Sequence, residues 1–231
     1  MDDNLVGYWK LDDRNGATDL SGNGNDGTGE GGISIGGAVG QSGLAGGATA
    51  FDGSNDYITI PTSDEISGFT NVSWSFWVNR DSNPISTQGI ITKYATINNQ
   101  RGYTITNGVN ENDTDLSMSF SDEGETYERI NTDSGFFTND EWIHCVVVYD
   151  EGDISVYKNG ELFDTLVSAK KSIFKNDANM EIGVYQISGS YFDGDIADVR
   201  IYNRIVRAEE VRQIYSITRR AYSPFARMYN I

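Results

Sequence analysis

The chain has 231 residues and carries 17 Lys and Arg against 34 Asp and Glu, which gives a formal net charge of −17 at pH 7. Because such a polyanion repels phosphate backbones, we expect no nucleic-acid partner. No apolar run approaches the roughly 20 residues of a membrane helix, so we also expect no membrane insertion.

The N-terminal sequence MDDNLVGYWKLDD lacks the basic region followed by an apolar stretch that defines a signal peptide. Taking Met1 as the native start, we expect no export by such a signal.

Residues 19–30 read DLSGNGNDGTGE and fit two motifs at once: the GxGxxG dinucleotide fingerprint and the spacing of an EF-hand calcium loop. Both motifs require helices. Residues 22–49 contain 12 glycines, and a segment so rich in glycine does not favour a helix. The loop still offers five oxygen-bearing side chains to a calcium ion: Asp19, Ser21, Asn23, Asn25 and Asp26. The alternative is a loop in which these side chains hydrogen-bond the backbone.

Alternating apolar and polar residues predict a series of short strands along most of the chain. They are a weak strand at 33–35, followed by 57–60, 72–79, 103–106, 116–120, 142–149, 154–157, 162–163, 180–184 and 192–202. The sequence Asn159-Gly160 between two of them predicts a tight hairpin, because a type I′ turn needs positive φ at both residues. Trp77 breaks the alternation of its strand, and we expect it to pack beneath a loop or the second sheet.

The segment 142–149 is almost wholly apolar and predicts a central strand buried on both faces. It contains the only cysteine, Cys145, and the only histidine, His144. Adjacent strand residues point to opposite faces, so we expect a buried, inert thiol and no Cys–His pair.

The spacing of turns and strands predicts an all-β fold, an antiparallel two-sheet jelly-roll sandwich, with one short C-terminal helix at 208–215. Residues 1–216 form the predicted domain, and residues 217–231 form a basic-aromatic tail. Residues 200–231 hold 7 Arg and 2 Glu, a charge of +5, whereas residues 1–199 carry 10 basic and 32 acidic residues, a charge of −22. The basic end therefore either docks on an acidic partner or folds back on the acidic body.

Several segments together resemble the laminin-G-like, concanavalin A-like lectin/glucanase superfamily, and within it a pentraxin-like branch. They are LVGYWKLD (5–12), DLSGNGNDGT (19–28), AFDGSNDYI (50–58), WSFWV (74–78), EWIH (141–144), VYKNG (156–160) and GDIADVRIYNR (194–204) before AEEV (208–211).

The resemblance implies a jelly roll whose first and last strands are adjacent and a structural Ca²⁺ near them. The positions that match such a site are Asp19, Asn23 and Asp198, with Asn25 and Asp12 as weaker candidates. If Asp198 shares a strand face with Ile196, its inward carboxylate needs a partner such as a cation. The alternative places Asp198 and Arg200 on a solvated face.

Glucanases of this superfamily use clustered carboxylates on one strand, and no strand here has that pattern, so we expect no enzyme activity. We expect a binding module, with a glycan as the ligand. Aromatic and polar side chains near the longer loops are candidate sugar contacts: Tyr94, Arg101, Tyr103, Tyr127, Tyr185 and Tyr191.

We expect the tail to contact a capsid or neighbouring copies, including in a homo-oligomer, and thus to anchor a domain displayed on a virion or in the extracellular space. Its candidate docking residues are Arg219, Arg220, Tyr222, Phe225, Arg227 and Tyr229. A purely structural capsid-decoration protein that binds no glycan and, less strongly, a glycoside hydrolase remain alternatives.

Overall fold

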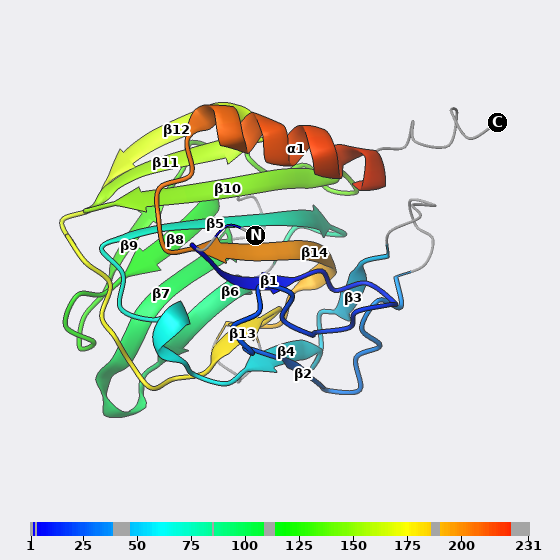
Figure 1. Ribbon diagram of the computed structural model, residues 1–231, viewed down its shortest axis with the longest axis horizontal. Coiled ribbons are helices and arrows are strands. Elements are labelled where there is room, and N and C mark those ends of the chain that lie inside the picture. The colour runs from blue at the N-terminus through cyan, green and yellow to red at the C-terminus, as the bar shows by residue number, and fades with distance from the viewer. Residues whose placement is uncertain are drawn as a thin grey trace.

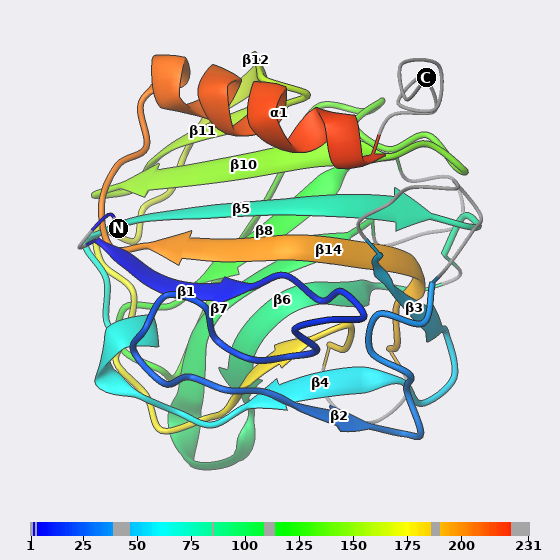
Figure 2. The same ribbon diagram turned by 45° about the vertical axis from the view of Figure 1, so that its right-hand side comes forward.

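The computed structural model describes residues 2, 4–38, 47–84, 86–108, 114–185 and 190–222, with the backbone alone for 220–222. Two antiparallel sheets face each other, and helix α1 (Ala208–Tyr222) lies across the outside of the first sheet (Figures 1 and 2). This arrangement is a jelly-roll sandwich, and it confirms the predicted fold class.

Both sheets consist of strands that pair with neighbours distant in sequence. The first sheet has the order β1 (Leu5–Trp9), β14 (Asp193–Tyr202), β5 (Asn71–Arg80), β10 (Ile143–Asp150), β11 (Asp153–Lys158) and β12 (Glu161–Val167), with β3 (Thr49–Asp52) also paired to β14. The second sheet has the order β2 (Thr28–Glu30), β4 (Tyr57–Ile60), β13 (Met180–Ile182), β6 (Gln88–Ala95), β7 (Gln100–Asn107), β8 (Leu116–Phe120) and β9 (Glu128–Asn131). Short 3₁₀ turns occupy Asp64–Ile66 and Ile97–Asn99. The first and last strands, β1 and β14, are adjacent as expected.

The core between the sheets is rich in aromatic side chains. Trp74 lies 5.0 Å from Tyr103 between ring centroids, and Phe120 lies 4.8 Å from Tyr149. Cys145 is fully buried in the same core, and burial raises the pKa of its thiol. The thiol is therefore protonated and inert, as predicted.

His144 points the opposite way, to the outer face of β10, where it is covered by α1. Its ring lies 5.2 Å from that of Trp77 and 5.9 Å from that of Tyr215. Burial lowers the pKa of His144 to about 3, so the imidazole is neutral at pH 7. The absence of a Cys–His pair is confirmed by this opposite orientation.

Trp77 corrects one expectation, because it packs beneath the helix rather than beneath a loop or the second sheet. Its ring is stacked on Tyr215 at 5.8 Å, and its Nε1 donates to Thr218 Oγ1 at 2.9 Å. The helix buries Val211 and Thr218 and half-buries Ile214 and Tyr215, the i, i+3, i+4, i+7 positions of one face.

Helix α1 extends beyond its predicted end. Glu210 at its start accepts a hydrogen bond from the backbone N–H of Arg207 at 3.0 Å, which satisfies one free donor of the first turn. The helix then runs to Tyr222, so the proposed boundary at residue 216 falls inside it. Within the described residues, no helix is long and apolar enough to span a membrane.

Candidate ligand-binding site

The loop 19–26 lies along the free edge of β1. Asp19 Oδ1 accepts the backbone N–H of Tyr8 at 2.9 Å, and the N–H of Leu20 donates to the carbonyl of Tyr8 at 2.8 Å. Asn25 Nδ2 donates to the carbonyl of Val6 at 3.0 Å. The loop thus satisfies the polar groups that an edge strand leaves unpaired.

The carboxylate of Asp19 has four hydrogen-bond donors. Besides Tyr8 N–H, it accepts from the backbone N–H and the hydroxyl of Ser21, both at 2.9 Å, and from the N–H of Asn25 at 3.0 Å. Asn23 Nδ2 donates to the carbonyls of Leu5 and Val6. This geometry supports the hydrogen-bonded alternative for the loop.

Asp198 does not share the inward face of Ile196. A β-bulge between Ala197 and Arg200 interrupts the alternation, and Asp198 has a φ of 57°. Its carboxylate accepts from Arg200 at 2.9 Å, and the Arg200 guanidinium also covers the ring of Tyr8 at 4.6 Å. The carboxylate of Asp198 is thus paired with Arg200, and both side chains are largely buried rather than solvated.

Asp12 is paired with Lys10 at 2.6 Å and accepts the backbone N–H groups of Arg14 and Asn15. In the described ranges, no three His, Cys, Asp or Glu side chains are grouped to hold a metal ion. A calcium ion at Asp12, Asp19 or Asp198 would have to compete with the hydrogen-bond and ion-pair donors that these carboxylates already have. Calcium binding stays a prediction for the set Asp12, Asp19, Asn23, Asn25 and Asp198.

A polar row crosses the outer face of the second sheet. Its members are cross-strand neighbours, one from each strand in spatial order: Thr28, Thr59, Glu181, Thr92, Thr104, Ser119 and Arg129. The residues beside them in sequence, such as Ile58 and Ile182, point into the core. The middle of the row is buried, because Thr92, Thr104 and Ser119 are at most 3% exposed and Glu181 is 8% exposed. Thr28 and Arg129, at its two ends, are exposed.

Three tyrosines gather near the β9 end of this row, and we call them the tyrosine cluster: Tyr94, Tyr127 and Tyr185. The Tyr94 ring lies 5.9 Å from that of Tyr127, edge to face, and 5.6 Å from that of Tyr185. Tyr127 is 41% exposed, and the other two are partly buried. The cluster offers the amphipathic aromatic surface that sugar rings pack against.

Arg101 supports this cluster from the paired strand. The register of β6 and β7 places Arg101 opposite Tyr94. Its Nε donates to Tyr94 Oη at 3.2 Å, and its Nη1 donates to the backbone carbonyls of Gly124 and Glu125. These bonds hold Arg101 between the strand and the loop before β9.

The phenol of Tyr185 stays protonated at neutral pH. Burial raises its pKa to about 12, and the neighbouring Tyr94 and Tyr127 add to the effect, whereas the charge of Arg129 opposes it. Tyr185 is therefore a hydroxyl donor and acceptor for a ligand.

The structure brings four of the six predicted sugar contacts together: Tyr94, Arg101, Tyr127 and Tyr185. Tyr103 is a correction, because it is 1% exposed and lies in the core, out of reach of a ligand. The ring of Tyr191 contacts that of Tyr57 at 6.2 Å, and its backbone pairs with Val184, the residue before Tyr185. Sequence reasoning missed Arg129 and Glu181, since 128–131 was not predicted as a strand and Glu181 stood in a short apolar one.

Glu181 is the one carboxyl group of the polar row, and burial raises its pKa to about 7. The charge of Glu30 adds to this, while the hydroxyl of Thr59, which donates to Glu181 Oε2 at 2.7 Å, opposes it.

We predict that Glu181→Gln removes a pH dependence of stability. A carboxyl group with a raised pKa binds more protons when folded, so its favourable contribution is complete below pH 4.5 and is lost as pH rises through 7. The variant should match the wild type at pH 4 and exceed it by about 2 kcal/mol at pH 8. Urea unfolding at both pH values measures this, with the exposed Glu65→Gln as control. An unchanged pH profile contradicts the assignment.

The candidate docking residues lie at or beyond the end of α1. Arg219 is exposed, with its guanidinium 5.9 Å from the ring centroid of Tyr215. The backbone of Arg220 and of Tyr222 belongs to the same helix. Phe225, Arg227 and Tyr229 lie outside the described residues.

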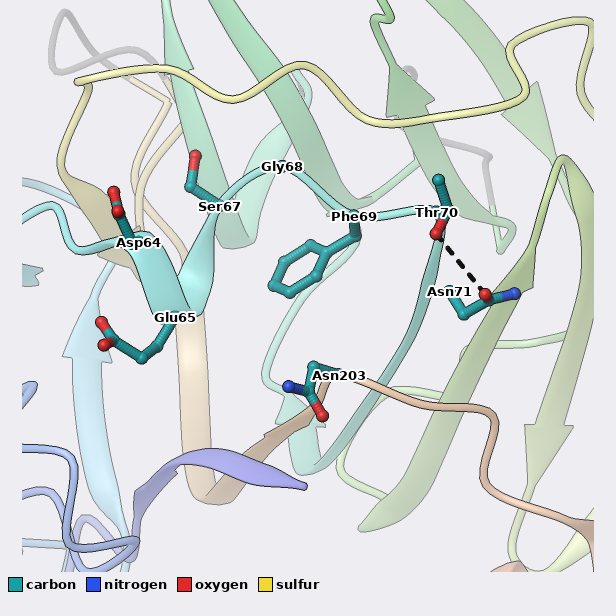
Figure 3. Close-up of a pocket in the computed structure, with 8 residues that line it drawn as sticks. All are labelled: Asp64, Glu65, Ser67, Gly68, Phe69, Thr70, Asn71 and Asn203. Atoms are coloured by element: carbon teal, nitrogen blue, oxygen red, sulfur yellow. Dashed lines mark hydrogen bonds between the residues drawn. The ribbon is translucent and has the colours of Figure 1, made fainter. Parts of the chain in front are cut away.

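A separate hollow of about 230 Å³ lies at another place on the surface and is lined by Asp64, Glu65, Ser67, Gly68, Phe69, Thr70, Asn71 and Asn203 (Figure 3). Its polar atoms are mainly carboxylates and amides, and Asp64 is paired with Lys175 at 2.7 Å. Phe69, its one aromatic residue, belongs to the core. The hollow thus lacks the exposed aromatic surface that the tyrosine cluster has.

The fold defines a two-sheet β-sandwich module. The family described as the Concanavalin A-like lectin/glucanases superfamily matches residues 52–212. The chain therefore belongs to this superfamily, while the pentraxin-like branch stays a prediction.

Several solved structures share the fold. The ligand binding domain of botulinum neurotoxin serotype D, in complex with N-acetylneuraminic acid, is 16% identical, with a TM-score of 0.70, and the match covers 93% of this chain and 51% of that one. The binding domain of Paraclostridial Mosquitocidal Protein 1 is 18% identical, with a TM-score of 0.72 and coverages of 92% and 52%. This chain thus spans about half the length of these toxin domains.

A third similar structure has nearly the same extent as this chain. It is domain 4 of AbnA, a GH43 extracellular arabinanase from Geobacillus stearothermophilus, in complex with arabinotriose. It is 20% identical, with a TM-score of 0.70, and the match covers 91% of this chain and 98% of that domain. At such identities the likeness establishes the shared fold.

Proposed function

We propose that this chain is a non-enzymatic glycan-binding module whose ligand packs against the tyrosine cluster. The observation that carries this is the partly exposed set of Tyr94, Tyr127 and Tyr185, braced by Arg101. Aromatic rings bind the apolar faces of sugars, and neighbouring hydroxyl and guanidinium groups bind their hydroxyls. Two proteins of similar fold were solved with a sugar bound, which supports the proposal.

The carboxyl groups of this face favour binding over hydrolysis. Most glycoside hydrolases use two carboxyl groups that flank the scissile bond. Glu181 and Glu30 lie near enough for the charge of Glu30 to raise the pKa of Glu181, but Glu181 is 8% exposed and hydrogen-bonded to Thr59, so it is not free to act on a bound sugar. The superfamily includes glucanases, so a hydrolase is the alternative against which binding is tested.

A glycan array probed with the full chain tests this function. We expect retention of at least one glycan class, without release of reducing sugar from that glycan. Parallel arrays with calcium and with chelator show whether the ion matters for binding. Failure to bind any glycan in either buffer contradicts the function and favours the purely structural alternative.

The setting that we propose for this module is an outer surface, either extracellular or on a virion, with residues 217–231 contacting a capsid or neighbouring copies. Support comes from the charge of +5 in residues 200–231 and from α1, where Ile217 is 75% exposed two residues before the exposed Arg219. Because Thr218 is bonded to Trp77, a truncation should end at Tyr222. If this shortened chain assembles like the full chain, an anchoring role of residues 223–231 is refuted.

A further inference from the structure

Arg129 lies beside the tyrosine cluster, two residues after Tyr127 in the sequence. It lies on β9 and is exposed, and its side chain makes no hydrogen bond or ion pair with the part of the chain that the structure describes. It is opposite Ser119 in the sheet, and its charge acts on the phenol of Tyr185. Its guanidinium thus faces solvent within reach of the cluster.

The acidic residues near Arg129 have other partners. The carboxylate of Glu128, the preceding residue, accepts from Ser168 Oγ and from the N–H of Ala169, both at 2.7 Å. Glu125 accepts from Asn99 Nδ2 at 3.3 Å, and Glu123 from Thr126 Oγ1 at 2.7 Å. On a chain of net charge −17, carboxylates are plentiful, yet none of these pairs with Arg129.

The two arginines of this face therefore differ in what they offer. Three N–H groups of Arg101 are used by Tyr94, Gly124 and Glu125, so this side chain is a support. Arg129 keeps its donors for a ligand. A guanidinium presents two parallel N–H groups that match a carboxylate, and this pairing is stronger than a hydrogen bond to a neutral hydroxyl.

We propose that the glycan bound by this face carries a carboxylate, with a sugar ring against the tyrosine cluster and the carboxylate on Arg129. The proposal rests on the proposed function and adds the class of ligand, an acidic saccharide such as a uronic or sialic acid. On so acidic a protein, a local guanidinium is needed to offset the general repulsion of an anionic sugar.

Matched pairs of sugars test this by calorimetric titration of the full chain. The pairs are trigalacturonic acid with galactotriose, which differ at C6, and sialyllactose with lactose. In at least one pair we expect the acidic member to bind about tenfold more tightly, the size of one charge-assisted hydrogen bond. This preference should shrink as salt is raised.

Substitutions then assign the preference to Arg129. Arg129→Gln should abolish the preference and keep the affinity for the neutral sugar, while Arg129→Lys should restore part of it. Arg14→Gln, at an exposed arginine remote in sequence from this face, is the control and should change nothing. Equal affinity for both members of every pair, or a preference that survives Arg129→Gln, overturns the inference but leaves glycan binding intact. Absence of binding to any sugar in the pairs and on the array contradicts both.

Discussion

Asp19→Ala is expected to lower the melting temperature by about 10 °C. The substitution removes an acceptor that is 7% exposed and leaves the N–H groups of Tyr8, Ser21 and Asn25 without a partner. Each buried donor left unpaired costs about 1–3 kcal/mol, and about 3–5 kcal/mol in total corresponds to such a shift for a chain of this size. Calorimetry or circular dichroism measures it.

The same melts separate the two roles of the loop 19–26. Asp13→Ala, at an exposed aspartate, is the control and should melt within about 2 °C of the wild type. If calcium binds here, chelator lowers the melting temperature of the wild type but not that of Asp19→Ala, because a bound ion stabilises the folded state. If the loop acts through hydrogen bonds alone, both proteins are insensitive to chelator. An Asp19→Ala protein as stable as the wild type contradicts the edge-covering role.

Trp77→Ala is expected to destabilise the protein by about 3–5 kcal/mol and to loosen α1 from the first sheet. The indole is 3% exposed, stacks on Tyr215 and donates to Thr218, so its removal leaves a cavity and an unpaired hydroxyl beneath the helix. Hydrogen exchange should show lost protection in residues 215–219 first, because Trp77 contacts this part of the helix while Val211 stays packed in the cluster of Val146 and Val148.

A substitution on the opposite side of α1 provides the control. Ile217→Ala removes a side chain that is 75% exposed and should change stability by less than about 0.5 kcal/mol. If Trp77→Ala leaves the exchange of 215–219 unchanged, the helix is held by other contacts.

The fold was largely predictable because strand alternation and turn chemistry are local signals. The hairpin at Asn159-Gly160 shows this best: both residues have positive φ, 53° and 87°, and join β11 to β12 as expected. The strand β10 was predicted from its apolar run and is indeed central, between β5 and β11. The predicted strand at 33–35 is wrong. The strand in this region is β2 at 28–30, whose partner β4 is fixed by tertiary pairing.

The errors at single residues have one origin. The face of the sheet on which a side chain lies depends on packing and on β-bulges, and alternation in the sequence does not show these. Asp198 was placed inward by counting along the strand, but the bulge after Ala197 changes the count. Trp77 broke the alternation because α1 gives the outer face of β5 a second apolar layer. Tyr103 was predicted as a sugar contact because it stands near a loop in the sequence. It lies inside β7, and its side chain is buried in the core.

The candidate site was predicted in part. Tyrosines and an arginine near loops are a compositional signal for sugar binding, and this signal found Tyr94, Arg101, Tyr127 and Tyr185. It gave no means of telling which aromatics converge, since that depends on the pairing of β6 with β7. Arg129 was missed because its importance lies in the absence of a partner within the described chain, which only coordinates show.

The central claim is that a glycan binds at the tyrosine cluster. The most direct measurement is calorimetric titration of the best array glycan into the wild type, Tyr127→Ala and Leu162→Ala. Tyr127, in the loop before β9, and Leu162, on β12 of the first sheet, are 41% and 53% exposed, so both variants should fold. We predict that Tyr127→Ala weakens binding at least tenfold and that Leu162→Ala binds like the wild type. Equal affinity of all three proteins would contradict the assignment of the site.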